Sequence, residues 1–151
     1  MKKVYIDANI FIDFLDEQRA MNDINLHEKA VSLFKNLISK NIKIITSEDI
    51  ITTAIYALRQ NKKALKILAD FLSEIKNLSD FAVVPFGYET ITNAAEFYIM
   101  NGGDFEDILQ YFYAMQNDCR AIYSNDKNFP EIDIPIKRTN PNLNDFSPKN
   151  V

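Results

Sequence analysis

The chain has one cysteine, three glycines and five prolines among its 151 residues, and it has no long apolar run. A single cysteine, Cys119, cannot form a disulfide within the chain, and this fits a reducing compartment. A membrane-spanning helix needs roughly 20 apolar residues, and the first residues reach the charge of Asp7 too soon for a secretory signal peptide. We therefore expect a cytoplasmic protein that is not anchored in a membrane.

Histidine and basic charge are also scarce. The one histidine, His27, lies in a polar stretch and is expected at the surface. The chain therefore has no histidine suited to acid–base catalysis. Cys119 has no histidine nearby in the sequence and is expected to be a packing residue. The net charge is −4, whereas proteins that bind nucleic acids are commonly basic. An acidic balance instead fits clustered carboxylates that a cation neutralises.

The sequence shows no internal division. No repeat, low-complexity tract or linker interrupts it, and its length is that of one domain. We expect a single domain over residues 1–146 and a loose C-terminal tail at residues 147–151. The stretch that begins at residue 139 is rich in asparagine and proline, and we expect it to be loose as well.

Short apolar segments alternate with helical patterns along the chain. Strands are expected at residues 4–6, 42–46, 81–84, 121–123 and 134–137. Helices are expected at residues 10–15, 25–40, 47–61, 62–76 and 104–117, and in the stretch that ends near residue 100, with a polar loop at 16–25. Asn25, Ser47 and Asp104 have side chains that commonly cap helix N-termini. This alternation predicts an α/β fold with a mainly parallel sheet covered on both faces.

Acidic residues stand where the strands of such a sheet end. Asp7 follows the first strand, Asp126 follows the fourth, and Asp104 and Asp107 open the helix before the fourth. Taken singly, Asp104 is a good helix cap and Asp126 a common turn residue. A carboxylate that closes a buried strand, as Asp7 does, is unfavourable without a partner. Because ligands of open α/β sheets bind beyond the carboxyl ends of the strands, the coincidence favours a functional site.

A group of carboxylates is suited to a hard divalent cation. Mg²⁺ and Mn²⁺ prefer oxygen ligands, and carboxylates brought together repel one another unless they are protonated or bridged by a cation. Such an ion can activate water, orient a phosphodiester and stabilise the departing oxygen. The sequence therefore predicts a metal site and catalytic centre of Asp7, Asp107 and Asp126, with Asp104 in or near the metal shell.

Three segments carry a resemblance to a known family. Residues 4–13, VYIDANIFID, resemble the opening of PIN domains, where an apolar strand ends in an Asp that is followed two residues later by an Asn. Residues 104–110, DFEDILQ, resemble the central acidic motif of one PIN branch, and residues 122–129, IYSNDKNF, resemble the last acidic motif. The order and spacing of the three segments match the family over nearly the whole chain.

The resemblance implies both a fold and an activity. The fold is a Rossmann-like three-layer α/β/α sandwich, and the activity is cleavage of RNA with Mg²⁺ or Mn²⁺. Asp7, Asp107 and Asp126 take the catalytic and metal-binding roles, and Asp104 is a further metal ligand. Asn9 is a supporting residue, and Asp13 either supports the site or is a polar residue that faces solvent. Many small members are toxins of VapBC-type pairs, which dimerise and are inhibited by a partner protein. The expected partners are therefore an RNA substrate, an antitoxin protein and a second copy of the chain.

One departure from the family concerns its second acidic motif. Many PIN nucleases carry a Glu about six residues after the Ser that starts the helix following the second strand. Counting from Ser47 gives Thr53, with Thr52 beside it. Glu48 and Asp49, at the start of that helix, either supply a ligand from a shifted position or complement the helix dipole. This departure leaves open a catalytically weak or silent PIN domain that binds RNA or a protein.

Two other classes of α/β protein have acidic sites and are disfavoured. Haloacid-dehalogenase-type phosphatases need an Asp nucleophile with a second Asp two residues later, and this chain has Asn9 at that place. Receiver domains normally have a pair of acids at the end of the first strand, and only Asp7 stands there.

Overall fold

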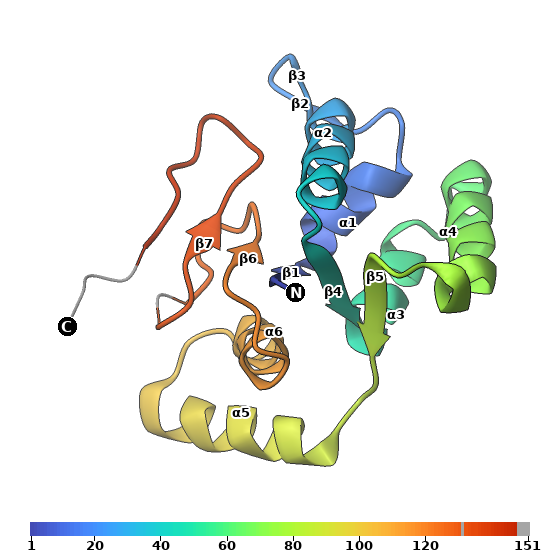
Figure 1. Ribbon diagram of the computed structural model, residues 1–151. Coiled ribbons are helices and arrows are strands. Elements are labelled where there is room, and N and C mark those ends of the chain that lie inside the picture. Colours follow the sequence, from blue (N-terminus) through green and yellow to red (C-terminus); the bar gives the residue numbers. More distant parts are fainter. Residues whose placement is uncertain (131, 148–151) are drawn as a thin grey trace.

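The centre of the molecule is a five-stranded sheet. The computed structural model describes residues 1–130 and 132–147. Its strands lie in the order β5–β4–β1–β6–β7, and each neighbouring pair is parallel (Figure 1). They are β1 (Lys3–Ile6), β4 (Lys43–Ser47), β5 (Phe81–Val84), β6 (Ile122–Tyr123) and β7 (Ile136–Lys137). The predicted α/β fold with a central parallel sheet is confirmed.

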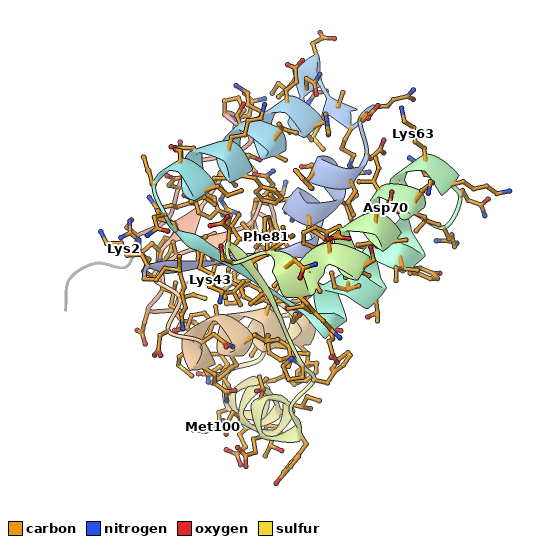
Figure 2. The ribbon with its side chains drawn as sticks, turned by 45° about the vertical axis from the view of Figure 1, so that its right-hand side comes forward. Lys2, Lys43, Lys63, Asp70, Phe81 and Met100 are labelled. Atoms are coloured by element: carbon orange, nitrogen blue, oxygen red, sulfur yellow. The ribbon has the colours of Figure 1, made fainter. Side chains whose placement is uncertain are left out.

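Helices cover both faces of this sheet. α1, α2 and α4 gather on one side of the sheet, and α5 and α6 lie on the other (Figure 1 and Figure 2). The α-helices are α1 (Ala8–Leu15), α2 (Leu26–Ser39), α3 (Glu48–Ala57), α4 (Lys62–Glu74), α5 (Tyr88–Asn101) and α6 (Phe105–Gln116). A short 3-10 helix, η1 (Ile75–Asn77), follows α4. In the part of the chain that the structure describes, no helix combines the length and apolar composition that a membrane crossing requires.

Strand β1 occupies the middle of the sheet and is buried on both faces. Val4, Tyr5 and Ile6 are at most 2% exposed. A strand covered on both faces requires an unbroken apolar run rather than an alternating one, and β1 has such a run. It pairs with β4 on one side and with β6 on the other. Because these strands are parallel, their carboxyl ends meet at one edge of the sheet.

An aromatic cluster joins β5 to the helices that cover it. Phe81 (labelled in Figure 2) meets Phe34 of α2 and Phe71 of α4, with ring centroids 5.8 and 5.1 Å apart. Phe71 also meets Phe11 of α1 at 6.0 Å. Edge-to-face pairs of this kind contribute roughly 0.5–1.5 kcal/mol each beyond the area they bury. The cluster therefore fixes α1, and the residues that begin it, relative to the sheet.

The predicted helix caps are confirmed. The side-chain oxygens of Asn25, Ser47 and Asp104 each accept from the backbone N–H three residues later, at 3.0, 3.1 and 3.1 Å. Each bond satisfies an amide that the helix itself leaves without a partner. Asn61 caps α4 in the same way, so the helix that was expected to reach residue 61 ends earlier, at Ala57.

The stretch 16–25, expected to be a loop, contains a short antiparallel hairpin of β2 (Ala20–Met21) and β3 (Ile24–Asn25). Its turn residues Asn22 and Asp23 have φ of 49° and 65°. The type I′ hairpin turn requires left-handed values at both central positions, and Asn and Asp tolerate them. The polar composition concealed the hairpin because its two strands are short and mostly exposed.

The segment that begins at residue 139 is not loose, contrary to the expectation. The backbone of Phe146 pairs with that of Ile136 through two hydrogen bonds of 2.8 Å. The side-chain oxygen of Asn125 accepts from the N–H groups of Thr139 and Asn140, at 3.0 and 3.1 Å. One asparagine side chain thus satisfies two backbone donors of an otherwise irregular segment. Of the predicted loose tail, residues 148–151 lie outside the described residues.

Candidate active site

An acidic cleft of about 270 Å³ lies at the carboxyl edge of the sheet. Asp7 follows β1, Asp126 follows β6, and Asp107 stands in the first turn of α6. All three line the cleft together with Asn9. The aspartates predicted from the strand ends therefore meet at one place. The other lining residues are Ala8, Ile12, Arg19, Ile50, Thr53, Glu106 and Gln110.

Asp7 is oriented by its neighbours. Its Oδ2 accepts from the hydroxyl of Ser124 at 2.6 Å and its Oδ1 from the backbone N–H of Ala8 at 2.8 Å, and the Asn9 amide nitrogen lies 3.5 Å from Oδ2. Burial raises the pKa of Asp7, and the two shorter hydrogen bonds oppose that shift. Ser124, fully buried, also accepts from the Asp126 N–H at 3.1 Å. Little in the sequence singles out Ser124, which is visible there only as a hydroxyl residue directly after a buried strand.

The carboxylate of Asp107 is buried and incompletely satisfied. Asp107 is 8% exposed, and its Oδ2 has no hydrogen-bond partner among the described residues. Burial first, and then the neighbouring carboxyls of Asp126, Asp7 and Asp104, raise the pKa of Asp107 to about 8. A carboxylate in these surroundings is stabilised only by a proton or by a cation.

Three of the predicted residues do not line the cleft: Asp104, Glu48 and Asp13. Asp104 is exposed, and its side chain accepts from the backbone N–H of Asp107, although its charge still raises the pKa of Asp107. Glu48 is exposed as well, and its Oε2 accepts from the N–H of Phe86, beyond β5, at 3.3 Å. Of the two roles left open for Glu48, this position fits the complement to the helix dipole, because the start of α3 presents that side chain toward the end of β5 and not toward the cleft.

A second acidic pair stands beside the first. Asp49, in the first turn of α3, accepts from Nε2 of Gln110 at 2.5 Å. Hydrogen bonding with Asp49, followed by burial, raises the pKa of Glu106 to about 7. Thr53, at the place where many PIN nucleases have Glu, lines the same cleft. Glu106 and Gln110, four residues apart, share one face of α6, but the sequence alone does not place Asp49 of α3 beside that face.

Asp13 acts on the cleft through an arginine. It is 2% exposed, and its Oδ1 accepts from Nε of Arg19 at 3.1 Å. Burial raises the pKa of Asp13, and Arg19 opposes the shift. Among the described residues, Arg19 is the one cation that lines the cleft. The sequence pointed to Asp13 but not to Arg19, because the chain turns back after α1 to bring the arginine to the cleft.

His27 and Cys119 behave as structural groups. His27, expected at the surface, is half-buried, and its Nδ1 lies 2.9 Å from the backbone carbonyl oxygen of Asp13. Cys119 is buried as expected, and burial raises the pKa of its thiol to about 12. Since the thiolate is the reactive form of cysteine, Cys119 is not a nucleophile at neutral pH.

The donor set of the cleft fits a hard divalent cation. Within residues 1–130 and 132–147, no three His, Cys, Asp or Glu side chains form a ready-made metal cage. Mg²⁺, however, is usually held by one or two carboxylates, with water and substrate oxygens completing its shell. The unpartnered Oδ2 of Asp107, close to Asp7 and Asp126, is a ligand of the required kind.

Residues 4–135 match the PIN domain family. Ribonuclease VapC1 of Aquifex aeolicus (strain VF5) is 35% identical over 142 residues, which cover 91% of this chain and 91% of that relative. The likeness first seen in three acidic segments therefore extends along nearly the whole chain.

Two solved structures resemble the fold. VapC20 of Mycobacterium tuberculosis, a sarcin–ricin loop cleaving toxin, has a TM-score of 0.63 and 15% identity, and the match covers 83% of this chain and 92% of that one. VapBC2 of Rickettsia felis, bound to a DNA fragment from their promoter, has a TM-score of 0.60 and 16% identity, and the match covers 90% and 98%. At these identities the likeness concerns the fold alone.

The raised pKa of Asp107 predicts a loss of stability with rising pH when no metal is bound. Its folded pKa of about 8 lies above the unfolded value of about 4, so the folded chain keeps a proton that the unfolded chain releases in that window. The free energy of unfolding should therefore fall between about pH 4 and about pH 8. The free energy of unfolding of Asp107→Asn, whose side chain does not titrate, should fall less over the same pH range than that of the parent. Urea unfolding at both ends of the window, with chelator, measures this, and equal losses for the two proteins would contradict it.

Proposed function

Starting from the finding that this chain belongs to the PIN-domain family, we propose that it is a metal-dependent endoribonuclease and the toxin of a toxin–antitoxin pair. The observation that carries the proposal is the buried, unpartnered oxygen of Asp107, which lies close to Asp7 and Asp126. The name of the Aquifex aeolicus relative, a ribonuclease aligned over 91% of both chains, supports the reaction class.

Asp7, Asp107 and Asp126 are the residues that would hold Mg²⁺ or Mn²⁺, and Asp104 adds its charge from the rim. When bound, such an ion supplies the charge that activates water and stabilises the departing oxygen of a phosphodiester. Ser124 and the Asp7–Ala8 turn keep the Asp7 carboxylate in one orientation. A ligand that is already oriented needs little reorganisation during the reaction.

Glu106 and Arg19 supply the other chemistry of the cleft. A carboxyl with a pKa of about 7 both takes and releases a proton near neutral pH, as a general acid or base must. We assign to the Glu106 carboxyl the proton exchange with the attacking water or the departing oxygen. Arg19, held at Nε by Asp13, brings a planar cation that matches phosphate oxygens. We assign to Arg19 the binding of the phosphodiester.

A catalytically silent PIN domain that binds RNA or a protein is the second candidate. Thr53 favours it, because this residue lines the cleft without the carboxylate that many PIN nucleases have there. The Asp49–Glu106 pair favours the enzyme instead, because it places acidic oxygens beside the same cleft.

Partner proteins are the other part of the proposal. Tyr88, Ile99 and Met100 of α5 are 79%, 80% and 83% exposed, and Figure 2 shows Met100 on the outermost helix. Large exposed apolar side chains mark interaction surfaces, and we assign them to a contact between two copies of the chain. The VapBC2 structure contains two kinds of protein by its name, which supports an antitoxin partner. The unit that we propose is a cytoplasmic, single-domain chain over residues 1–146 that dimerises.

The dimer is tested by the mass of the purified chain. Light scattering should give about twice the 17.4 kDa of one chain. The double change Ile99→Lys and Met100→Lys should lower the mass to that of one chain, because two charges would replace apolar contact area. If the unmodified chain has the mass of a monomer at every concentration, the assignment of α5 to a dimer contact is wrong.

Asp7→Asn tests the catalytic assignment. The change keeps the size of the side chain and removes a ligand charge, so cleavage of single-stranded RNA in Mn²⁺ should fall at least about a hundredfold, or nearly 3 kcal/mol in barrier height. Glu48→Gln, a matched removal of charge outside the cleft, should cost less than about tenfold. The measurement is a cleavage time course in which chelator abolishes the activity.

The same assay separates the candidates. Equal cleavage by the parent and Asp7→Asn would place the nuclease elsewhere or in a contaminant. An inactive parent that still binds Mn²⁺ would favour the silent binding module.

A further inference from the structure

A second cavity adjoins the acidic cleft. It has a volume of about 400 Å³ and shares Asn9, Arg19 and Asp126 with the cleft. Its walls come from segments that are distant in the sequence: the β2–β3 hairpin, the loop 125–128 after β6, and the C-terminal stretch 140–143. We call this cavity the side groove. Its volume falls within the range of roughly 300–1,000 Å³ that small-ligand sites have.

The side groove combines apolar surface with amide groups. Met21, Leu26 and Leu143 supply the apolar surface, and Met21 is 53% exposed. An unpaired nucleobase requires both kinds of group, because its faces pack against flat or apolar side chains and its edges need hydrogen-bond partners. Asparagine offers a donor and an acceptor in one side chain.

Asn140 is the buried amide that keeps a donor for a ligand. Asn9 and Asn125 use their amides inside the protein, toward Ser124 and Thr139. Asn140 is 8% exposed, and its Oδ1 accepts from the backbone N–H two residues later, at 3.0 Å. Its Nδ2 is not among the fully buried atoms without a partner in the described part of the chain, and Asn140 lines the side groove. The amide of Asn140 is therefore held in place through its oxygen, and its nitrogen can donate to an acceptor on a ligand in the side groove.

Arg19 stands where the cleft and the side groove join. Its Nε is bound to Asp13, which is buried, and its side chain is 45% exposed. The guanidinium is therefore fixed at one corner, and its outer nitrogens remain available to an anion. Lys127, which is exposed, adds a second positive charge to the groove lining. A phosphate at this junction would touch both cavities.

We propose that the side groove binds the nucleotide next to the scissile phosphodiester of single-stranded RNA. Arg19 holds the phosphate between the cleft and the groove, Met21 and Leu143 pack against the base, and Asn140 donates from Nδ2 to the base edge. The inference rests on the proposed function, because it takes the cleft as the place of cleavage. Base preference then resides in the side groove and not among the metal-binding acids.

RNA binding by a cleavage-deficient chain isolates the groove. The full chain with Asp7→Asn is titrated, in Mn²⁺, into four labelled homopolymeric oligoribonucleotides, and fluorescence anisotropy gives each affinity. Adding Met21→Ala should weaken binding at least about fivefold, because apolar area beside the base is lost. The matched control Met115→Ala, at a 41% exposed methionine of α6 outside the groove lining, should leave the affinities unchanged.

Asn140→Asp tests the reading of the base. It keeps the oxygen that accepts from the Asn142 N–H and replaces the donor by an acceptor, so the order of the four affinities should change. Asn142→Asp adds the same charge at an exposed position outside the groove lining and should leave that order as it is.

The outcomes separate the groove from the proposed function. An unchanged order for Asn140→Asp, together with equal affinities for Met21→Ala and Met115→Ala, overturns the inference. Cleavage by the chain with Asp7 intact is assayed in parallel. If that chain does not cleave RNA, the proposed function fails, whereas the binding data still decide whether the groove holds a nucleotide.

Discussion

Repulsion among carboxylates gathered at one edge of the sheet is the constraint on which the rest of the site depends. The parallel pairing of β1 with β6 brings Asp7 and Asp126 together, and the Asp7 N–H donates to the Tyr123 carbonyl oxygen at 3.0 Å. Asp107 joins them from α6. Burial raises the pKa of both Asp7 and Asp107, so the fold holds an arrangement of charge that only protons or a cation relieve. The proposed metal binding and the proposed catalysis both rest on that arrangement.

The C-terminal segment gives the acidic edge its rigidity. Arg138 donates from its guanidinium to the backbone carbonyl oxygens of Ser124 and Asp126, at 2.8 and 2.5 Å, and from its backbone N–H to the side chain of Asp145 at 2.8 Å. Asn125, between those two residues, is bonded to the same segment. Loops are usually the more mobile parts of a fold. The loop after β6 is hydrogen-bonded to the C-terminal segment at three consecutive residues, 124–126. Residues of this loop and of the C-terminal segment together line one side of the side groove.

The sheet edge and its aspartates could be predicted because the signals are local. An apolar strand followed by an acid identifies Asp7 and Asp126, and a helix start identifies Asp107. The Asp49–Glu106 pair could not be predicted, because it depends on how α3 packs beside α6. The absence of the family Glu directed attention to both Glu48 and Asp49, and only the packing of α3 shows that Asp49 lies beside α6 whereas Glu48 contacts Phe86. The order of the C-terminal segment was not predicted for a similar reason. The groups that bind its asparagine-rich backbone lie in a loop elsewhere in the chain.

The most direct test of the acidic edge as a cation site is the position of Mn²⁺ in a crystal of the protein, located by its anomalous scattering. The predicted result is a peak within about 2.5 Å of the Asp107 Oδ2, with the carboxylate of Asp7 or Asp126 in its shell. The Asp107 pKa, raised to about 8 in the metal-free chain, makes alkaline crystals the favourable case. A peak elsewhere on the molecule, or none at saturating Mn²⁺ with Asp107 still unpartnered, would contradict the central claim.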